Sequence, residues 1–122
     1  MLARTEKLRD LIQSKHSQRK WSKAVRERDE YQCCLEIRRV KGWKKCGSRD
    51  KVEAAHIFPR WESGTAAFQI VNGITVCLKH HKILDNNTLG PQTDILRVPP
   101  ARYEAAFRAV SFACTYPPKR RQ

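Results

Sequence analysis

The sequence predicts a small single-domain α+β fold whose centre runs strand, loop, strand, helix, with a metal staple and with further helices at both ends. Three observations support this prediction. First, 122 residues are enough for one hydrophobic core and leave no room for a second. Second, helical spacing of apolar residues near both ends gives way to short apolar runs in the middle. Third, five cysteines offer ligands for a metal ion, which small domains often need for stability.

The net charge predicts a polyanionic partner. Lys and Arg total 25 against 12 Asp and Glu, so the formal net charge is +13. A domain this basic is typical of nucleic-acid binding, with an anionic membrane surface as a weaker alternative. Disorder is not expected, because 40% of the residues are hydrophobic. No apolar run approaches the roughly 20 residues of a membrane span. The first residues lack the pattern of a secretory leader, so we expect a reducing, cytoplasmic compartment.

The N-terminal quarter is expected to be helical. Leu8, Leu11 and Ile12 recur at helical spacing and form a narrow apolar stripe among basic residues. Ser22 is the expected N-cap of a second short helix over 23–29, with Trp21 as an apolar anchor before it. The pattern is then irregular over 31–47, which predicts a loop or knuckle.

The centre of the chain carries the clearest pattern. Four successive elements are expected: a strand over 52–58, a loop over 60–71, a strand over 74–76 and a helix over 77–85. Pro59 ends the first strand because it cannot donate to a continuing ladder. Asn72-Gly73 is a strong turn signal before the second strand. The helix segment contains neither Gly nor Pro until it is ended by Asn86-Asn87.

The C-terminal part predicts a short strand over 95–98 and a last helix that begins at Pro99-Pro100. One face of this helix is expected to be apolar through Tyr103, Ala106, Phe107 and Val110, and Cys114 is expected in the core. By composition we divide the chain into a basic helical extension (1–20), a main domain (21–110) whose core motif spans 52–86, and a basic tail (111–122).

A first cluster of candidate ligands predicts a structural zinc site. Its members are Cys33, Cys46, Cys77 and His80, and Zn²⁺ prefers four such ligands in a tetrahedron. Cys34 competes with Cys33 for the first place, and the sequence leaves that choice open. The alternative is that these are buried free cysteines acting as small hydrophobic residues.

A second cluster predicts a catalytic site. Residues four apart on a helix lie one above the other, so His81 and Asp85 can hold one ion. Nitrogen and hard oxygen ligands suit Mg²⁺ or Mn²⁺ left partly hydrated. His56, on the facing strand, is a suitable general base because its imidazole titrates near neutral pH.

Three blocks of this sequence resemble the HNH nucleases with their ββα-metal fold. The blocks are Ala55-His56-Ile57-Phe58-Pro59, then Asn72-Gly73-Ile74-Thr75-Val76-Cys77, then His80-His81-Lys82 closing on Asp85. The resemblance covers about residues 21–90. It implies that His56 is the general base, that Asn72 braces the loop and positions the base, and that His81 is the final motif histidine. Zinc-containing members also carry paired cysteines around the motif, which supports the four zinc ligands.

The sequence departs from the family in two places. Many members have Asp or His immediately before the base as a metal ligand, whereas Ala55 cannot coordinate an ion. Glu53 lies on the same strand face and is a candidate outer-sphere partner. The second departure is the wide loop from Cys33 to Cys46. Its basic residues either follow a phosphate backbone or form a solvated surface; they are Arg38, Arg39, Lys41, Lys44 and Lys45.

The resemblance implies a metal-dependent endonuclease that hydrolyses DNA phosphodiester bonds to 5′-phosphate and 3′-hydroxyl ends. One such site cuts one strand, so nicking is the simplest activity, and double-strand cleavage needs a dimer or two events. The alternative is a zinc-stabilised nucleic-acid-binding module without catalysis. The expected partner is DNA, with a homodimer or phage packaging proteins as further partners, in the cytoplasm of a bacterial or phage-infected cell. Packaging, mobile elements and host defence all remain open as biological settings.

Overall fold

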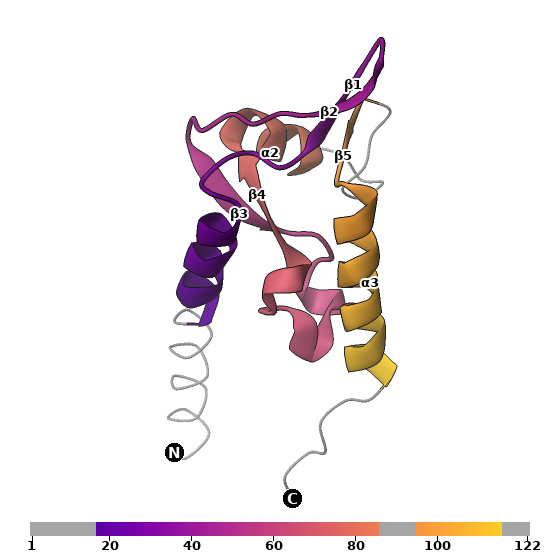
Figure 1. The fold of residues 1–122 in the computed structure, drawn as a ribbon. Coiled ribbons are helices and arrows are strands. Elements are labelled where there is room, and N and C mark those ends of the chain that lie inside the picture. The colour runs from indigo at the N-terminus through magenta and orange to yellow at the C-terminus, as the bar shows by residue number, and fades with distance from the viewer. Residues whose placement is uncertain (1–16, 86–94, 116–122) are drawn as a thin grey trace, which may run out of the picture.

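The computed structural model describes residues 17–85 and 95–115. Figure 1 shows two small sheets with a short helix over one of them and a long helix along one side of the molecule. The elements are β1 (Glu36–Arg39), β2 (Gly42–Lys45), β3 (Val52–His56), β4 (Gly73–Cys77), α2 (Leu78–Asp85), β5 (Leu96–Arg97) and α3 (Pro100–Thr115). A helix over residues 17–28 precedes them. The α+β prediction is confirmed.

The central unit consists of β3, β4 and α2. The two strands are antiparallel, and their register runs from Val52 opposite Cys77 to His56 opposite Gly73. Helix α2 begins directly after β4 and packs against both strands (Figure 1). Every residue of β4 is buried, because this strand lies between the N-terminal helix and the main core. The predicted order of strand, loop, strand and helix is confirmed.

The second sheet differs from the expected irregular knuckle. Residues 36–45 form an antiparallel hairpin, with Ile37 opposite Lys44 and Arg38 opposite Trp43. Strand β5 adds to the free edge of β1, so the order is β2-β1-β5. The sequence concealed this hairpin because its strands have few apolar residues. Cross-strand pairs stabilise it instead, since Arg97 hydrogen-bonds to Glu36 at 2.9 Å and its guanidinium lies 4.2 Å from the centre of the Trp43 ring.

The N-terminal helix also differs from expectation. It runs without a break over 17–28, so the predicted N-cap at Ser22 is wrong. Trp21 and Val25 are on its buried face and pack closely over Gly73 of β4. Tertiary packing of this apolar face outweighs the capping preference of one serine. The apolar stripe at Leu8, Leu11 and Ile12 lies outside the described residues, as does the tail after residue 115.

The segment between β3 and β4 is a chain of three short 3-10 turns over Arg60–Glu62, Gly64–Ala66 and Ile70–Asn72. The turn predicted at Asn72-Gly73 is the last of these three, closed by the Gly73 N–H, which donates to the Ile70 carbonyl; Gly73 itself has extended backbone with φ −119° and ψ 150° and begins β4. Gly73 is needed for a close approach. A Cβ atom there would lie 2.4 Å from Cγ2 of Val25.

The main core gathers residues from both sheets and α3, among them Leu35, Ile57, Ile74, Leu96 and Ala106. Helix α3 packs against the turn segment through a second cluster of Ala66, Val110 and Ala113. Phe107 is 54% exposed, so only part of the predicted apolar face is buried. Cys114 is exposed and the prediction that it lies in the core is wrong.

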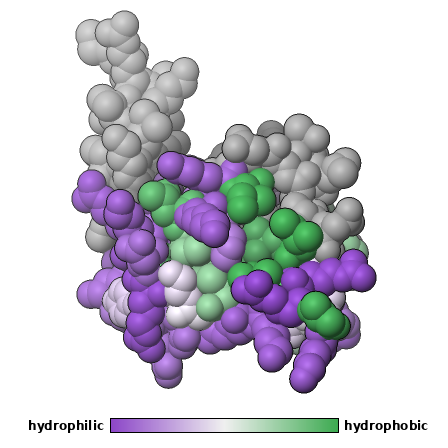
Figure 2. Space-filling model, turned by 90° about the horizontal axis from the view of Figure 1, so that it is seen from above, coloured by the Kyte–Doolittle hydropathy of each residue, from purple (hydrophilic) through white to green (hydrophobic). Residues whose placement is uncertain are grey.

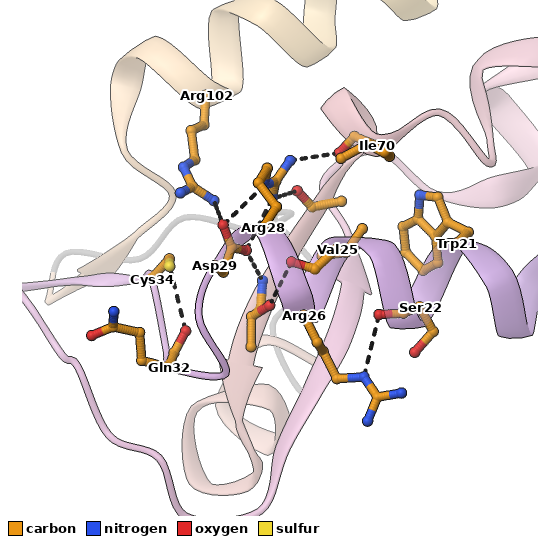
Figure 3. A network of polar contacts seen from close by, with 12 residues as sticks. Trp21, Ser22, Val25, Arg26, Arg28, Asp29, Gln32, Cys34, Ile70 and Arg102 are labelled. Atoms are coloured by element: carbon orange, nitrogen blue, oxygen red, sulfur yellow. Dashed lines mark hydrogen bonds and ion pairs between the residues drawn. The ribbon is translucent and has the colours of Figure 1, made fainter.

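A buried carboxylate joins three parts of this fold, as Figure 3 shows. The Asp29 side chain is fully buried at the end of the N-terminal helix. It accepts two hydrogen bonds from Arg28 at 2.9 Å and one from the Thr75 backbone N–H in β4 at 2.9 Å. Arg102 of α3 adds an ion pair at 2.7 Å. These contacts fix the N-terminal helix and α3 to the same strand.

None of the described helices is long and apolar enough to cross a membrane. The helices also do not stop at residues 20 and 110, since one spans 17–28 and α3 continues to Thr115. The division of the chain into extension, domain and tail stays a prediction.

Candidate metal centre and active site

The structure brings four soft and borderline ligands together where β1, β4 and α2 meet. The Sγ atoms of Cys33, Cys46 and Cys77 and a ring nitrogen of His80 all lie within 4.8 Å of one another. Nδ1 of His80 is 3.2 Å from the Cys77 sulfur and 3.7 Å from the Cys33 sulfur. A tetrahedral Zn²⁺ with bonds of about 2.3 Å to sulfur and 2.0 Å to nitrogen separates such ligands by about 3.5 Å. The geometry and chemistry of the set therefore fit zinc.

Burial shifts the cysteine and histidine side chains of this cluster toward their neutral forms. Burial raises the pKa of Cys33 to about 12, although backbone N–H groups of Cys77 and Leu35 act against this and the neighbouring cysteines act with it. Burial also lowers the pKa of His80, assisted by the charge of Lys79. A neutral imidazole is the form that binds zinc. A divalent cation would compensate the thiolate charges that burial otherwise disfavours.

The structure places Cys33, and not Cys34, in the four-residue cluster. The backbone N–H of Cys34 donates to Thr75 in β4 at 2.9 Å, and its thiol donates to the Gln32 carbonyl at 3.3 Å. Cys33 instead belongs to the four-residue cluster. The knuckle is closed by hydrogen bonds from Gly47 N–H to Cys33 O at 2.9 Å and from Cys46 N–H to Leu35 O at 2.8 Å.

The second cluster is centred on His81. Nδ1 of His81 in α2 lies 2.7 Å from Oε2 of Glu53 in β3. The Ala55 methyl group is on the same strand face as Glu53 by strand alternation and offers no ligand. Both polar side chains reach solvent, since His81 is 25% and Glu53 50% exposed. The side chain of Asp85, the predicted partner of His81, lies outside the described residues.

His56 ends β3 and lies in an aromatic enclosure. Its ring stacks on Trp21 with centroids 4.1 Å apart and planes 15° apart, and Phe68 meets it edge-on at 5.9 Å. Burial lowers the pKa of His56, and the charge of Arg60 lowers it further, while the Ala67 backbone acts in the opposite direction. Nε2 is buried and has no hydrogen-bond partner within 17–85 and 95–115. Burial and the Arg60 charge thus favour the neutral form of this imidazole.

Asn72 is fully buried and holds the backbone that leaves His56. Its Oδ1 accepts from the Phe58 N–H at 2.9 Å, and its Nδ2 donates to the Phe58 carbonyl at 3.2 Å. Nδ2 also donates to Oγ of Ser63 at 3.2 Å, and that hydroxyl donates to the Pro59 carbonyl at 2.6 Å. The two side chains together fix the course of residues 57–63, so that the end of β3 has one conformation.

Strand β3 presents its two functional side chains to different neighbours. His56 contacts the N-terminal helix through Trp21, and Glu53 contacts α2 through His81. Two strand residues lie between them, so the two positions are about 10 Å apart along the strand. Two separate sets of contacts are thus made along β3. Asn72 bonds to the loop that follows His56, and His81 pairs with Glu53.

Three residues of this region had little signal in the sequence. Trp21 was predicted as an anchor, but nothing indicated that it would stack on His56. Ser63 is an ordinary loop serine until its contacts are seen. Asp29 directly follows Arg28, and only the fold shows that it is fully buried. Each depends on contacts between residues more than five positions apart, which no local pattern encodes.

Comparison with known proteins bears on the same region. Residues 44–90 match the family model described as HNH endonuclease. No curated protein and no solved structure matches this chain. The matched residues span β3, β4 and α2 and so contain His56, Asn72 and His81. The resemblance is thereby confirmed over residues 44–90, which are similar to the HNH endonuclease family.

Proposed function

We propose that this protein is a metal-dependent endonuclease that hydrolyses DNA phosphodiester bonds. The observation that carries the proposal is the coincidence of the family match over 44–90 with a β3-β4-α2 unit that contains His56, Asn72 and His81. This family is a nuclease family, so phosphodiester hydrolysis is the expected reaction class. The finer assignments below concern the roles of individual residues.

His56 is proposed as the general base. A base for water at neutral pH needs an uncharged imidazole with an available nitrogen. Burial and the Arg60 charge both lower the pKa of His56, and Nε2 has no partner in the described part of the chain. Because Nε2 is buried, the Trp21 or Phe68 ring must shift to admit water. Asn72 acts as a positioning residue, since it fixes the backbone from Phe58 onward.

His81 and Asp85 are proposed as ligands of a divalent ion, Mg²⁺ or Mn²⁺. When bound, such an ion polarises the scissile phosphate and stabilises the leaving 3′ oxygen. The solvent exposure of His81 leaves room for phosphate and water. Cys33, Cys46, Cys77 and His80 are proposed as a closed zinc site, whose four protein ligands make it structural.

The basic hairpin is proposed to bind the DNA backbone. Its cations are all exposed: Arg38, Arg39, Lys41, Lys44 and Lys45. A pocket of about 530 Å³ beside the zinc cluster carries further cations, Lys51, Lys79 and Lys82 among its lining residues. Figure 2 shows this end of the molecule, where hydrophilic residues surround a central group of hydrophobic ones. Contacts of cations with phosphates supply affinity without reading sequence.

The test is a plasmid-nicking assay with the zinc-loaded protein in Mg²⁺, Mn²⁺ or EDTA. We expect conversion of supercoiled to open-circular DNA that requires the divalent ion and gives 5′-phosphate and 3′-hydroxyl ends. His56→Ala should abolish nicking and leave DNA affinity within about twofold, because the side chain serves proton transfer. Full nicking by this variant would refute the base assignment.

One observation favours a second candidate function, a zinc-stabilised DNA-binding module without catalysis. Nε2 of His56 is buried under Trp21, and position 55 has no ligand atom. The assay separates the two candidates, because a binding module shifts DNA in a gel and never nicks it at any concentration of Mg²⁺ or Mn²⁺.

A further inference from the structure

We propose that Glu53 is a direct ligand of the divalent ion and supplies, together with His81, the carboxylate that position 55 lacks. The inference rests on the proposed nuclease function and assigns a residue that the family motif does not supply. Its basis is the pairing of these two side chains across the interface of β3 and α2.

The distance between the two ligand atoms fits an ion. Nδ1 of His81 and Oε2 of Glu53 lie 2.7 Å apart. Two ligands at right angles on an ion, each about 2.1 Å from it, lie about 3 Å apart. An ion therefore fits between them and the incoming phosphate with a change of a few tenths of an ångström. Imidazole nitrogen with carboxylate oxygen is a donor set that suits Mn²⁺ and, with added water, Mg²⁺.

The position of Glu53 explains how it can replace a ligand at position 55. Glu53 and Ala55 share one face of β3 because strand side chains alternate. The two Cβ atoms are thus about 7 Å apart along the strand, a distance that the three-bond side chain of Glu53 partly spans. Helix α2 packs on this face, which brings His81 to the carboxylate. With 50% of Glu53 exposed, water and phosphate oxygens can complete the coordination.

The pair is separate from the zinc cluster. His80 belongs to that cluster and is buried, whereas the adjacent His81 is rotated by about 100° around the helix and reaches solvent. The three cysteines are soft ligands that hold zinc tightly, so an oxygen-preferring ion is left to Glu53 and His81. The competing explanation is an ordinary ion pair that fastens α2 to β3, and the test is chosen to distinguish the two.

The experiment measures Mn²⁺ binding without DNA. Zinc-loaded protein, at one zinc per chain, is titrated with Mn²⁺ and free Mn²⁺ is followed by electron paramagnetic resonance. Loss of a residue that only supports a metal ligand costs 10–100-fold in affinity. Glu53→Gln removes the charged ligand itself and keeps its shape, so it should weaken Mn²⁺ binding by more than about 100-fold. Glu104→Gln is the matched control, because Glu104 is also an exposed glutamate in an ion pair, with Arg108 at 2.6 Å. Its Mn²⁺ affinity should not change.

A second variant keeps the proposal testable if Glu53→Gln disturbs the packing of α2. Ala55→Asp, added to Glu53→Gln, places a carboxylate on the same face and should restore Mn²⁺ affinity to within about tenfold of the original protein. Unchanged Mn²⁺ binding by Glu53→Gln would overturn the proposal. Weakened binding that Ala55→Asp does not restore would overturn it as well, because the loss would then follow from the displaced helix.

The outcome is independent of the nuclease activity. If the protein binds Mn²⁺ through Glu53 but never nicks DNA, the metal site stands and the proposed function fails. If the protein nicks DNA and Glu53→Gln binds Mn²⁺ as tightly as the original protein, the proposed function stands and the assignment of Glu53 as a ligand fails.

Discussion

The close contact at Gly73 provides a test of how the N-terminal helix is held over β4 and His56. In the structure, a Cβ atom on residue 73 would lie 2.4 Å from Cγ2 of Val25 and 2.7 Å from Cζ2 of Trp21. Carbon atoms in contact prefer about 3.5–4.0 Å. Gly73→Ala must therefore displace the helix by about 1 Å, since the valine methyl group and the indole ring cannot move aside on flexible bonds.

The cost follows from this overlap. Overpacking a core typically costs 1–3 kcal/mol, and both clashing residues are nearly fully buried, so we expect about 3 kcal/mol of lost unfolding free energy. The displacement also separates Trp21 from His56, whose rings are now 4.1 Å apart. Urea denaturation of the zinc-loaded protein, followed by tryptophan fluorescence, measures the change in the free energy of unfolding.

The control is a double-mutant cycle with Val25→Ala, which removes the nearest clashing atom. The double variant should be more stable than the sum of the single effects by about 1 kcal/mol or more. Gly42→Ala provides a comparison of another kind, because open space surrounds it and only its φ of +114° is strained. The close packing of this helix would be refuted if the free energy of unfolding of Gly73→Ala lay within 0.5 kcal/mol of the original protein's. Strictly additive effects in the cycle would refute it as well.

Three further predictions concern the ion pairs, the zinc ligands and the hairpin. Burial by itself raises the pKa of Asp29, but hydrogen bonds from Arg28, the Thr75 N–H and Arg102 outweigh it and lower the pKa from 3.8 to about 2. This difference corresponds to about 2 kcal/mol at neutral pH. The contribution is present above pH 3.8 and is lost as the pH falls toward 2, so the stability difference between the original protein and Asp29→Asn should narrow from pH 7 to pH 3 in urea denaturation. Cys33→Ser should lower the bound zinc, measured by mass spectrometry, well below one ion per chain. Cys34→Ser should leave the bound zinc unchanged, because Cys34 is also buried but lies outside the cluster. The opposite result would show that Cys34 and not Cys33 is the ligand. The double substitution Arg38→Ala and Lys44→Ala should reduce the slope of log DNA affinity against log salt concentration by about 2. Lys23→Ala, at an exposed position on the N-terminal helix, is the comparison. An unchanged slope would mean that DNA binds elsewhere on the protein.

The sequence determined the parts of this protein that local pattern encodes. The strand before Pro59, the strand before Cys77 and the helix after it follow from apolar runs and from punctuation by proline, asparagine and glycine, and the structure has all three. The sequence predicted Cys46, Cys77 and His80 as zinc ligands and left Cys33 and Cys34 as alternatives for the fourth position. The HNH motif selected His56, Asn72 and His81 because the chemistry of these side chains is recognisable without coordinates.

The tertiary structure decided the rest because the deciding contacts join distant residues. Only the folded chain shows that Cys33 rather than Cys34 lies near Cys46, Cys77 and His80. The need for Gly73 depends on a helix about 50 residues earlier. The β1–β2 hairpin is stabilised by Arg97 from the far side of the chain rather than by its own apolar pattern. Sequence placed His56 in a strand, but its pKa is lowered by burial and by the charge of Arg60, which only the tertiary structure brings about. Likewise, only the approach of α2 brings His81 to Glu53.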